Sequence, residues 1–269
     1  MTGENKTKSF AENFYMFLML VFLYAPVIIL IVFSFNNSRS RGIWGGFSLK
    51  WYEQMMRDSQ LMGALKTTLV VGVLSAIISA VIGTAAVMGI EAFKNRAVKK
   101  AVTTVTNIPI VSSELVTGVS LMILFIALKI PRGMFTMLLA HITFNIPYVM
   151  LSVMPKMKQL DKSMYEAALD LGAKPWYAFR QVVMPELMPG IINGLLIAFT
   201  LSIDDFVISY FTTGNGVTNL SIYVYTMAKR LNPKINALST VMFVSVMVLL
   251  LIINKRASKD KDENVLMEG

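Results

Sequence analysis

The chain has 269 residues, of which 55% are hydrophobic and 15% charged, and its mean hydropathy is +0.61. This composition excludes an ordinary soluble domain, in which about a quarter of the residues are charged. The absence of cysteine excludes a disulfide framework and a thiolate metal site. The net charge of +9 does not indicate nucleic acid, because the basic residues lie between apolar blocks and at the chain ends, where they face anionic lipid.

Six apolar blocks with few or no charges predict six transmembrane helices. The first block, 14–35, would be roughly 33 Å long as a helix, which is enough to cross the hydrocarbon core and too long for a cleavable signal peptide. Helices are expected because the blocks lack the alternation of barrel strands and lipid leaves no backbone polar group unpaired. The remaining blocks are 67–90, 101–128, 133–154, 189–211 and 235–253.

Basic residues in the short loops predict the orientation of the spans. They crowd the connection after the second span and follow the last span, so both termini are expected in the cytoplasm. The first loop is also basic, and it carries Trp44, Trp51 and Tyr52, which suit an interfacial helix at headgroup depth. The predicted organisation is a cytoplasmic N-terminus (1–13), a first span (14–35), an extracytoplasmic loop (36–63), a five-span core (64–253) with a cytoplasmic loop at 155–188, and a cytoplasmic tail (254–269).

The cytoplasmic loop reads as two short helices in an L. Ser163 with Glu166 predicts a capping box at the start of the first helix, and Gly172 predicts a left-handed residue at its end. Pro175 suits the first turn of the second helix, which is expected to end before Pro185.

One face of the first loop helix is apolar at three- and four-residue spacing, and nothing else in the loop covers it. A groove on another protein is therefore its expected partner. The face consists of Met164, Ala167, Ala168 and Leu171.

The same loop carries a family resemblance. Glu166-Ala167-Ala168, then Gly172, then Val182-x-Met184-Pro185 resembles the Glu-Ala-Ala (EAA) loop of ABC importer permeases, with valine and methionine replacing the family's isoleucine and leucine. The resemblance implies an all-α polytopic membrane protein with the type I ABC importer permease (MetI-like) fold. It also implies that a partner ATPase docks on Glu166, Ala167, Ala168, Gly172 and Pro185. A purely local capping role for Glu166 is the alternative.

Over nearly its whole length the chain resembles the permease subunits of spermidine/putrescine importers. The matching stretches are Leu49-Lys50-Trp51-Tyr52, His141-Ile142-Thr143-Phe144, Glu166 to Gly172, and Phe199 to Asp205. The resemblance implies a cell-membrane heterodimer with a second, related permease, two copies of an ABC ATPase that bind ATP and Mg inside, and a polyamine-binding protein outside. The chain itself lacks a phosphate-binding loop, so neither a cofactor nor an enzymatic activity is expected in it.

Three acidic residues fall within the expected spans: Glu114 in the third, and Asp204 and Asp205 in the fifth. An ionised carboxylate there costs roughly 2.5–3.5 kcal/mol, so either a cation from another subunit or a cationic cargo must compensate it. A polyamine path needs carboxylates and aromatic faces. The predicted path residues are Trp51, Glu114, Ser202, Asp204, Asp205 and Tyr210. Ser202 and Asp205 share a helical face, which predicts that one aspartate lines the path while the other holds the packing.

Other functions fit the sequence less well. An ABC importer for another small cationic solute would keep the docking loop, and a stand-alone ion-coupled carrier would use the aspartates as ion ligands. His141 is the only histidine, so it is interpreted as an interhelical hydrogen-bonder and no metal site is expected. Gly72, Gly83 and Gly89 are interpreted as points of close helix approach. A membrane enzyme is disfavoured because no nucleophile, base and metal set can be assembled.

Overall fold

The computed structural model describes residues 3–40, 42–214, 216–229, 233–245 and 247. The chain divides into two compact units, one made of Met1–Ser59 with Thr226–Gly269 and the other of Gln60–Tyr225. Within the described residues, helices make up the fold and the extended pairing is a single bridge between Asn36 and Phe47. The expected all-α class is therefore confirmed.

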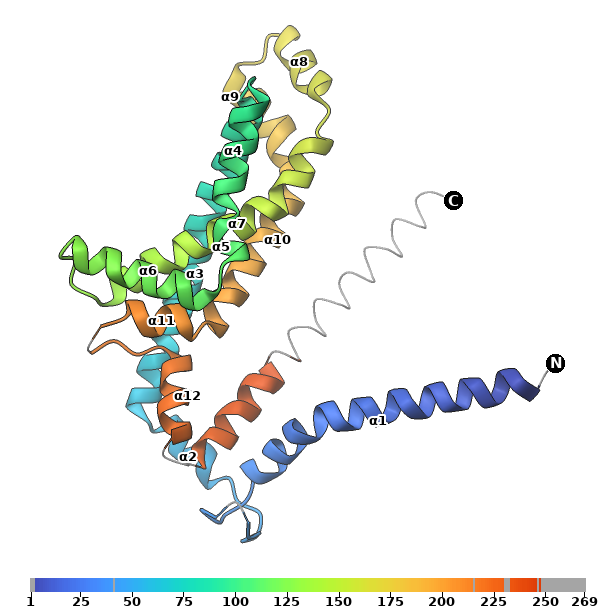
Figure 1. The fold of residues 1–269 in the computed structure, drawn as a ribbon, viewed down its shortest axis with the longest axis vertical. Coiled ribbons are helices and arrows are strands. Elements are labelled where there is room, and N and C mark those ends of the chain that lie inside the picture. Colours follow the sequence, from blue (N-terminus) through green and yellow to red (C-terminus); the bar gives the residue numbers. More distant parts are fainter. Residues whose placement is uncertain (1–2, 41, 215, 230–232, 246, 248–269) are drawn as a thin grey trace. The chain divides into compact units, whose positions relative to one another are not determined.

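The first unit contains α1 (Gly3–Ser34), α2 (Lys50–Met56) and a helical stretch at 234–245. The second unit carries the remaining helices, which Figure 1 labels in chain order. They are α3 (Ser59–Ala92), α4 (Arg96–Thr106), α5 (Ile108–Val111), α6 (Glu114–Ala127), α7 (Met134–Gln159), α8 (Lys162–Asp170), α9 (Pro175–Ala178), the π-helical turn η1 (Phe179–Val183), α10 (Met184–Asp204), α11 (Val207–Thr212) and α12 (Leu220–Lys229).

Among the described residues, four helical stretches are long and apolar enough to cross a membrane. They are Phe14–Ser34, Ser59–Ala92, Met134–Gln159 and Pro175–Asp204, and they correspond to the first, second, fourth and fifth predicted spans. The sixth predicted span, 235–253, lies partly outside the described residues. Its described part is helical from 234 to 245.

The third predicted span, 101–128, is not one helix but three. Asn107 ends α4, and Pro109 stands in the first turn of α5, where its missing N–H is not needed. Ser112 is extended, and the hydroxyl of Ser113 then caps α6 by accepting a hydrogen bond from Leu115 N. The hydropathy of the sequence predicted these three helices as one span, because the residues at the breaks are small or apolar.

The fifth predicted span, 189–211, is also interrupted. The α10 helix ends at Asp204, and the chain begins a new short helix at Val207. The predicted spans of this unit are thus interrupted before α5, before α6 and before α11, all within sequence expected to be buried in lipid.

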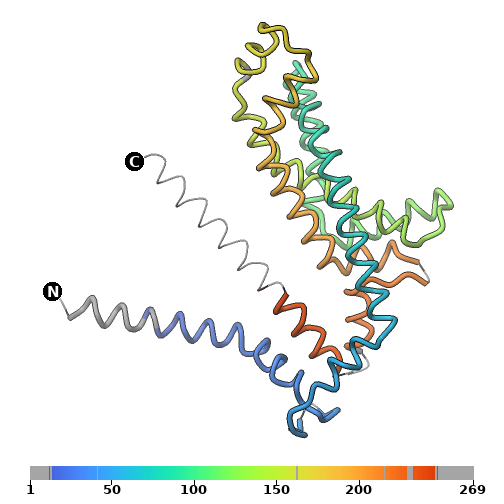
Figure 2. Tube along the Cα trace, turned by 180° about the vertical axis from the view of Figure 1, so that it is seen from behind, coloured from blue at the N-terminus to red at the C-terminus, as the bar shows by residue number. Residues whose placement is uncertain are grey.

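Close approaches of α3, α7 and α10 build the core of the second unit (Figures 1 and 2). A Cβ on Gly83 would lie 2.8 Å from Cγ1 of Val149, and one on Gly194 would lie 3.1 Å from Cα of Val149. Gly83 confirms the expected close approach, whereas Gly89 has nothing within 4 Å and does not. The buried core comprises Ala76, Val87, Ile90, Val149, Met150, Val153, Val183, Leu187 and Ala198.

The Gly83 contact is tested by a pair of alanine substitutions. Gly83→Ala forces α3 away from the branched side chain of Val149, and we expect it to destabilise the protein by about 1–3 kcal/mol. Gly89→Ala is the matched control in the same helix, and we expect it to stabilise by up to about 1 kcal/mol through helix propensity. Thermal unfolding of the detergent-purified chain measures both. Adding Val149→Ala should recover part of the Gly83→Ala loss, and an unchanged midpoint in Gly83→Ala would contradict the contact.

Candidate functional site

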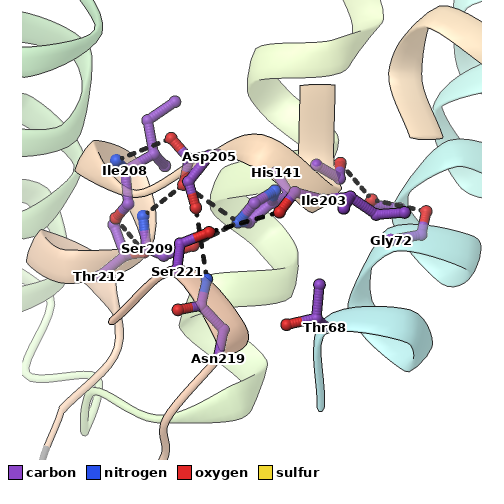
Figure 3. Close-up of polar contacts among 12 residues, drawn as sticks. Thr68, Gly72, His141, Ile203, Asp205, Ile208, Ser209, Thr212, Asn219 and Ser221 are labelled. Carbon is purple, nitrogen blue, oxygen red and sulfur yellow. Dashed lines mark hydrogen bonds and ion pairs between the residues drawn. The ribbon is translucent and has the colours of Figure 1, made fainter. Parts of the chain in front are cut away.

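The carboxylate of Asp205 accepts hydrogen bonds from the backbone at the break between α10 and α11. Its Oδ1 accepts a hydrogen bond from Ile208 N at 3.0 Å, and its Oδ2 accepts one from Ser209 N at 2.8 Å (Figure 3). These are donors of the first turn of α11, which have no partner within that helix. Asp205 is only 7% exposed, so its carboxylate serves as the acceptor for backbone N–H groups that the helix break leaves without a partner.

His141, in the neighbouring helix α7, lies next to Ser209 and Asp205 at this break. Its Nε2 lies 2.9 Å from the hydroxyl of Ser209 and 3.6 Å from Oδ2 of Asp205, and the ring is buried (Figure 3). Asn219, beyond α11, donates a hydrogen bond to the Asp205 carbonyl at 3.4 Å. The interpretation of His141 as an interhelical hydrogen-bonder is confirmed.

Ser202 lies in a second buried polar contact, one turn before the break. Its hydroxyl is 2.9 Å from that of Ser75 in α3, and it accepts a hydrogen bond from Nδ2 of Asn145 in α7 at 2.7 Å. Ser202 thus links three helices and is enclosed by them. The structure places this predicted path residue inside the helix packing, where a hydroxyl needs a partner.

Asp204 and Glu114 are exposed, in contrast to Asp205. Glu114 stands in the first turn of α6, at the other helix break, and not in the middle of a continuous span. Its carboxylate interacts electrostatically with both aspartates. The two breaks meet because α6 packs on α11, where a Cβ on Gly118 would lie 3.3 Å from Cα of Ile208. Neither Asp204 nor Glu114 forms an ion pair within the part of the chain that the structure describes.

An aromatic group adjoins the same break. The ring of Phe206 lies 5.4 Å from that of Tyr210 and 4.8 Å from that of Tyr225, measured between centroids. Tyr210 and Tyr225 keep much of their surface exposed. Sequence reasoning named Tyr210 but missed the other two. Phe206 follows the aspartate pair directly, which was an available signal, whereas Tyr225 is brought in by the turn before α12.

Trp51 belongs to the other unit, where its indole is almost fully enclosed. Its Nε1 donates a hydrogen bond to the carbonyl of Asn36 at 2.6 Å, and the ammonium of Lys50 lies 5.4 Å from its ring centroid. The structure therefore uses this tryptophan to hold the loop between α1 and α2 together.

The loop helix α8 begins two residues earlier than expected. Asp161, not Ser163, caps it, because the Asp161 carboxylate accepts a hydrogen bond from Ser163 N at 2.9 Å. This bond also lowers the pKa of Asp161. The end of α8 is as predicted: Gly172 has φ +83°, and Gly172 N and Ala173 N donate to the carbonyls of Leu169 and Ala168.

The second loop helix does not stop before Pro185, so that expectation was wrong. The chain is helical from Pro175 to Asp204 through η1, in which Met184 N donates to the carbonyl of Phe179. This wider turn shifts the hydrogen-bond register directly before Pro185, which has no N–H to contribute. The second loop helix, α9, is thereby continuous with α10.

The apolar face of α8 is open to solvent in this chain. Leu171 is 90% exposed, and Met164 and Ala167 are exposed as well. Tyr165 of the same helix is partly buried and packs against the core. Glu166 is exposed, and Pro185 lies in the first turn of α10.

Broken membrane-core helices, an acidic group at the breaks and an exposed loop helix are features of a membrane transport protein. The chain belongs to the family of binding-protein-dependent transport system inner membrane components, whose model matches residues 72–256. It is thus a permease subunit of an ABC importer and not an enzyme.

Two curated relatives align over most of the chain. The putrescine transport system permease protein PotI of Escherichia coli strain K12 is 38% identical over 232 residues, which cover 84% of this chain and 83% of the relative. The spermidine/putrescine transport system permease protein PotC of the same strain is 36% identical over 248 residues, which cover 92% and 93%.

Solved structures share the fold at low sequence identity. A chain from the crystal structure of a bacterial ABC transporter involved in alginate import matches with a TM-score of 0.73 and 13% identity, covering 95% of this chain and 98% of that one. A chain of an amino acid ABC transporter matches with a TM-score of 0.55 and 16% identity over 77% and 98%. The expected importer permease fold is confirmed by these likenesses.

The two adjacent aspartates should differ in what they do for stability. Asp205→Ala removes the acceptor of two backbone N–H groups, and we expect it to destabilise the chain by about 1–3 kcal/mol. Asp204→Ala removes an exposed carboxylate, and we expect no loss of stability. Thermal unfolding and the yield of folded chain in detergent compare the two variants, and equal midpoints would contradict the capping role of Asp205.

Proposed function

We propose that this permease subunit conducts polyamines, such as spermidine or putrescine, into the cytoplasm by alternating access. The observation that carries the proposal is that Asp204 and Glu114, two exposed carboxylates without an ion pair in the described structure, stand at the ends of two helix breaks in the membrane core, where α6 packs on α11. The identity of the relatives, which are named for putrescine and spermidine, supports the same cargo.

The chemistry of the breaks suits a flexible polycation. A carboxylate in a membrane interior is costly unless a cation accompanies it, and each ammonium of a polyamine offers such a cation. Exposed faces of Tyr210 and Tyr225 add cation-π attraction and contact for the methylene segments. In this scheme Asp204 and Glu114 meet the cargo, while Asp205 and Ser202 hold the helices that present them.

Partners complete the transporter in this proposal. A second, related permease forms the heterodimer, two copies of an ABC ATPase bind ATP and Mg on the cytoplasmic side, and a polyamine-binding protein delivers cargo outside. The exposed face of α8 docks on the ATPase, with Glu166, Ala167, Ala168, Gly172 and Pro185 forming or supporting the contact. A solved alginate importer of the same fold was crystallised with its periplasmic protein, which supports a similar delivery step here.

The organisation of the chain in the membrane follows from this docking. With α8 inside, both termini are cytoplasmic, the loop at 36–63 is outside, and the core at 64–253 includes the coupling loop at 155–188. ATP-driven movement of α8 reaches α9 across the turn at Gly172 and then α10 through η1, because the helix is continuous from Pro175 to Asp204. Helix breaks at the far end of α10 then open or close the path.

An importer for another cationic solute, such as an amino acid, would keep the docking loop but discard the acidic set. Competition of labelled spermidine uptake by putrescine and arginine distinguishes these cargoes. A stand-alone ion-coupled carrier would work without an ATPase, so copurification of an ATPase argues against it.

The cargo role predicts a specific loss of uptake. We expect Asp204→Asn to reduce labelled spermidine uptake at least about tenfold, since an amide no longer neutralises an ammonium, while the amount of intact complex stays unchanged. Glu114→Gln should give a smaller loss. Thr200→Val, at an exposed polar position of the same helix, is the matched control. Normal uptake in the Asp204→Asn, Glu114→Gln double variant, with normal recovery of complex, would overturn the assignment.

The docking role predicts a loss that spares the fold of the chain. Leu171 is almost fully exposed, so Leu171→Asp should leave thermal stability of the isolated chain unchanged. It should weaken ATPase association by at least about tenfold, because a charge enters an apolar contact. Pull-down of the ATPase measures this, with Asp170→Ser on the same helix as control. Wild-type recovery of ATPase with Leu171→Asp would contradict the proposed face.

A further inference from the structure

The segment between α1 and α2 is a folded loop built around one buried side chain, that of Asn36. Its Nδ2 donates to the carbonyl of Ile43 at 2.8 Å, and its Oδ1 accepts from Ser38 N at 3.1 Å and from Gly45 N at 2.7 Å. Its own carbonyl accepts the indole N–H of Trp51. These bonds close the loop and fix which side chains it presents.

The closed loop presents apolar side chains outward. Phe47 is 72% exposed, Ile43 65% and Trp44 51%. A loop free to rearrange would bury such groups, but the hydrogen bonds of Asn36 hold them out. Arg39 and Lys50 are exposed beside them, so the loop combines a large apolar tip with positive charge.

Contacts with the end of α1 place this apolar tip beside a membrane span. The ring of Trp44 lies 6.2 Å from that of Phe33, in the last turn of α1, and the hydroxyl of Tyr52 lies 2.6 Å from that of Ser34 at the helix end. The apolar part of α1 is not covered by other described parts of the chain, as expected for a helix that faces lipid. The tip therefore continues the apolar surface of α1 to the level where that helix leaves the hydrocarbon.

We propose that the tip formed by Ile43, Trp44 and Phe47 inserts into the headgroup region of the lipid bilayer at the C-terminal end of α1, and so anchors the loop to the membrane. Tryptophan is the residue that favours this depth, since its ring is apolar and its N–H is polar. Arg39 and Lys50 complement the lipid phosphates. The sequence reading expected an interfacial helix with Trp44, Trp51 and Tyr52; the structure instead turns Trp51 inward and assigns the lipid contact to the preceding turn. This inference does not depend on the cargo.

The test uses the natural absence of cysteine in the chain. Single substitutions Ile43→Cys and Phe47→Cys are labelled with a nitroxide in the assembled transporter, with partner subunits free of cysteine, in nanodiscs containing anionic phospholipid. Glu53→Cys, at an exposed polar position of α2, is the matched control. Electron paramagnetic resonance then compares relaxation by oxygen, which concentrates in lipid, with relaxation by a water-soluble nickel chelate.

A lipid contact predicts that the ratio of oxygen to nickel accessibility is several-fold higher at positions 43 and 47 than at position 53, and that it does not change when the binding protein is added. A ratio equal to that of the control would overturn the proposal. Shielding from both reagents would also overturn it, because a protein surface would then cover the tip.

Should the cysteine variants fail to assemble, quenching of tryptophan fluorescence by brominated lipid is the test. The wild-type protein should be quenched more than Trp44→Phe, and equal quenching would reject the contact.

Discussion

The hydrogen bonds that Asp205 accepts at the start of α11 are the interaction on which the transport core depends. In a bilayer, a helix can stop only where something other than water satisfies the freed backbone groups. Asp205 does this for two N–H groups at once, and His141 holds the neighbouring hydroxyl of Ser209. The break after α10 is therefore stabilised by specific hydrogen bonds and is not the frayed end of a helix.

The same rule explains the polar side chains around the break. The hydroxyl of Thr68 accepts a hydrogen bond from Leu220 N at 2.7 Å, at the start of α12, and the hydroxyl of Thr136 donates to the carbonyl of Thr212 at 2.8 Å, at the end of α11. Figure 3 shows Thr212 and Asn219 near Asp205, whereas Thr68 stands apart from them on α3. Because these short side chains replace water at each helix end, the chain can turn within the core and still leave Asp204 exposed.

The sequence predicted the first, second and fourth spans and most of the fifth, because hydrophobic length is a local property. It could not predict the breaks, which depend on partners far away in the chain: Thr68 and Leu220 are 152 residues apart. It also could not separate Asp204 from Asp205. A helical projection indicated that the two face different ways, but only the start of α11, two residues later, determines which carboxylate is enclosed.

In the loop at 155–188 the opposite holds, because short-range rules were nearly sufficient to predict its structure. Gly172 was predicted as the left-handed residue from its position alone, and the error at Ser163 was a shift of two residues along the chain to Asp161. The failure came at Pro185, where proline normally ends a helix. The π-helical turn η1 absorbs the missing donor, so α9 passes into α10 as one continuous helix, whereas the turn at Gly172 separates this helix from α8. A continuous helix has little freedom to bend, so Pro185 is not a hinge between Pro175 and Asp204. The helix that leads from the loop at 155–188 into the core therefore continues until Asp204, and it breaks where Asp205 is enclosed and Asp204 is exposed.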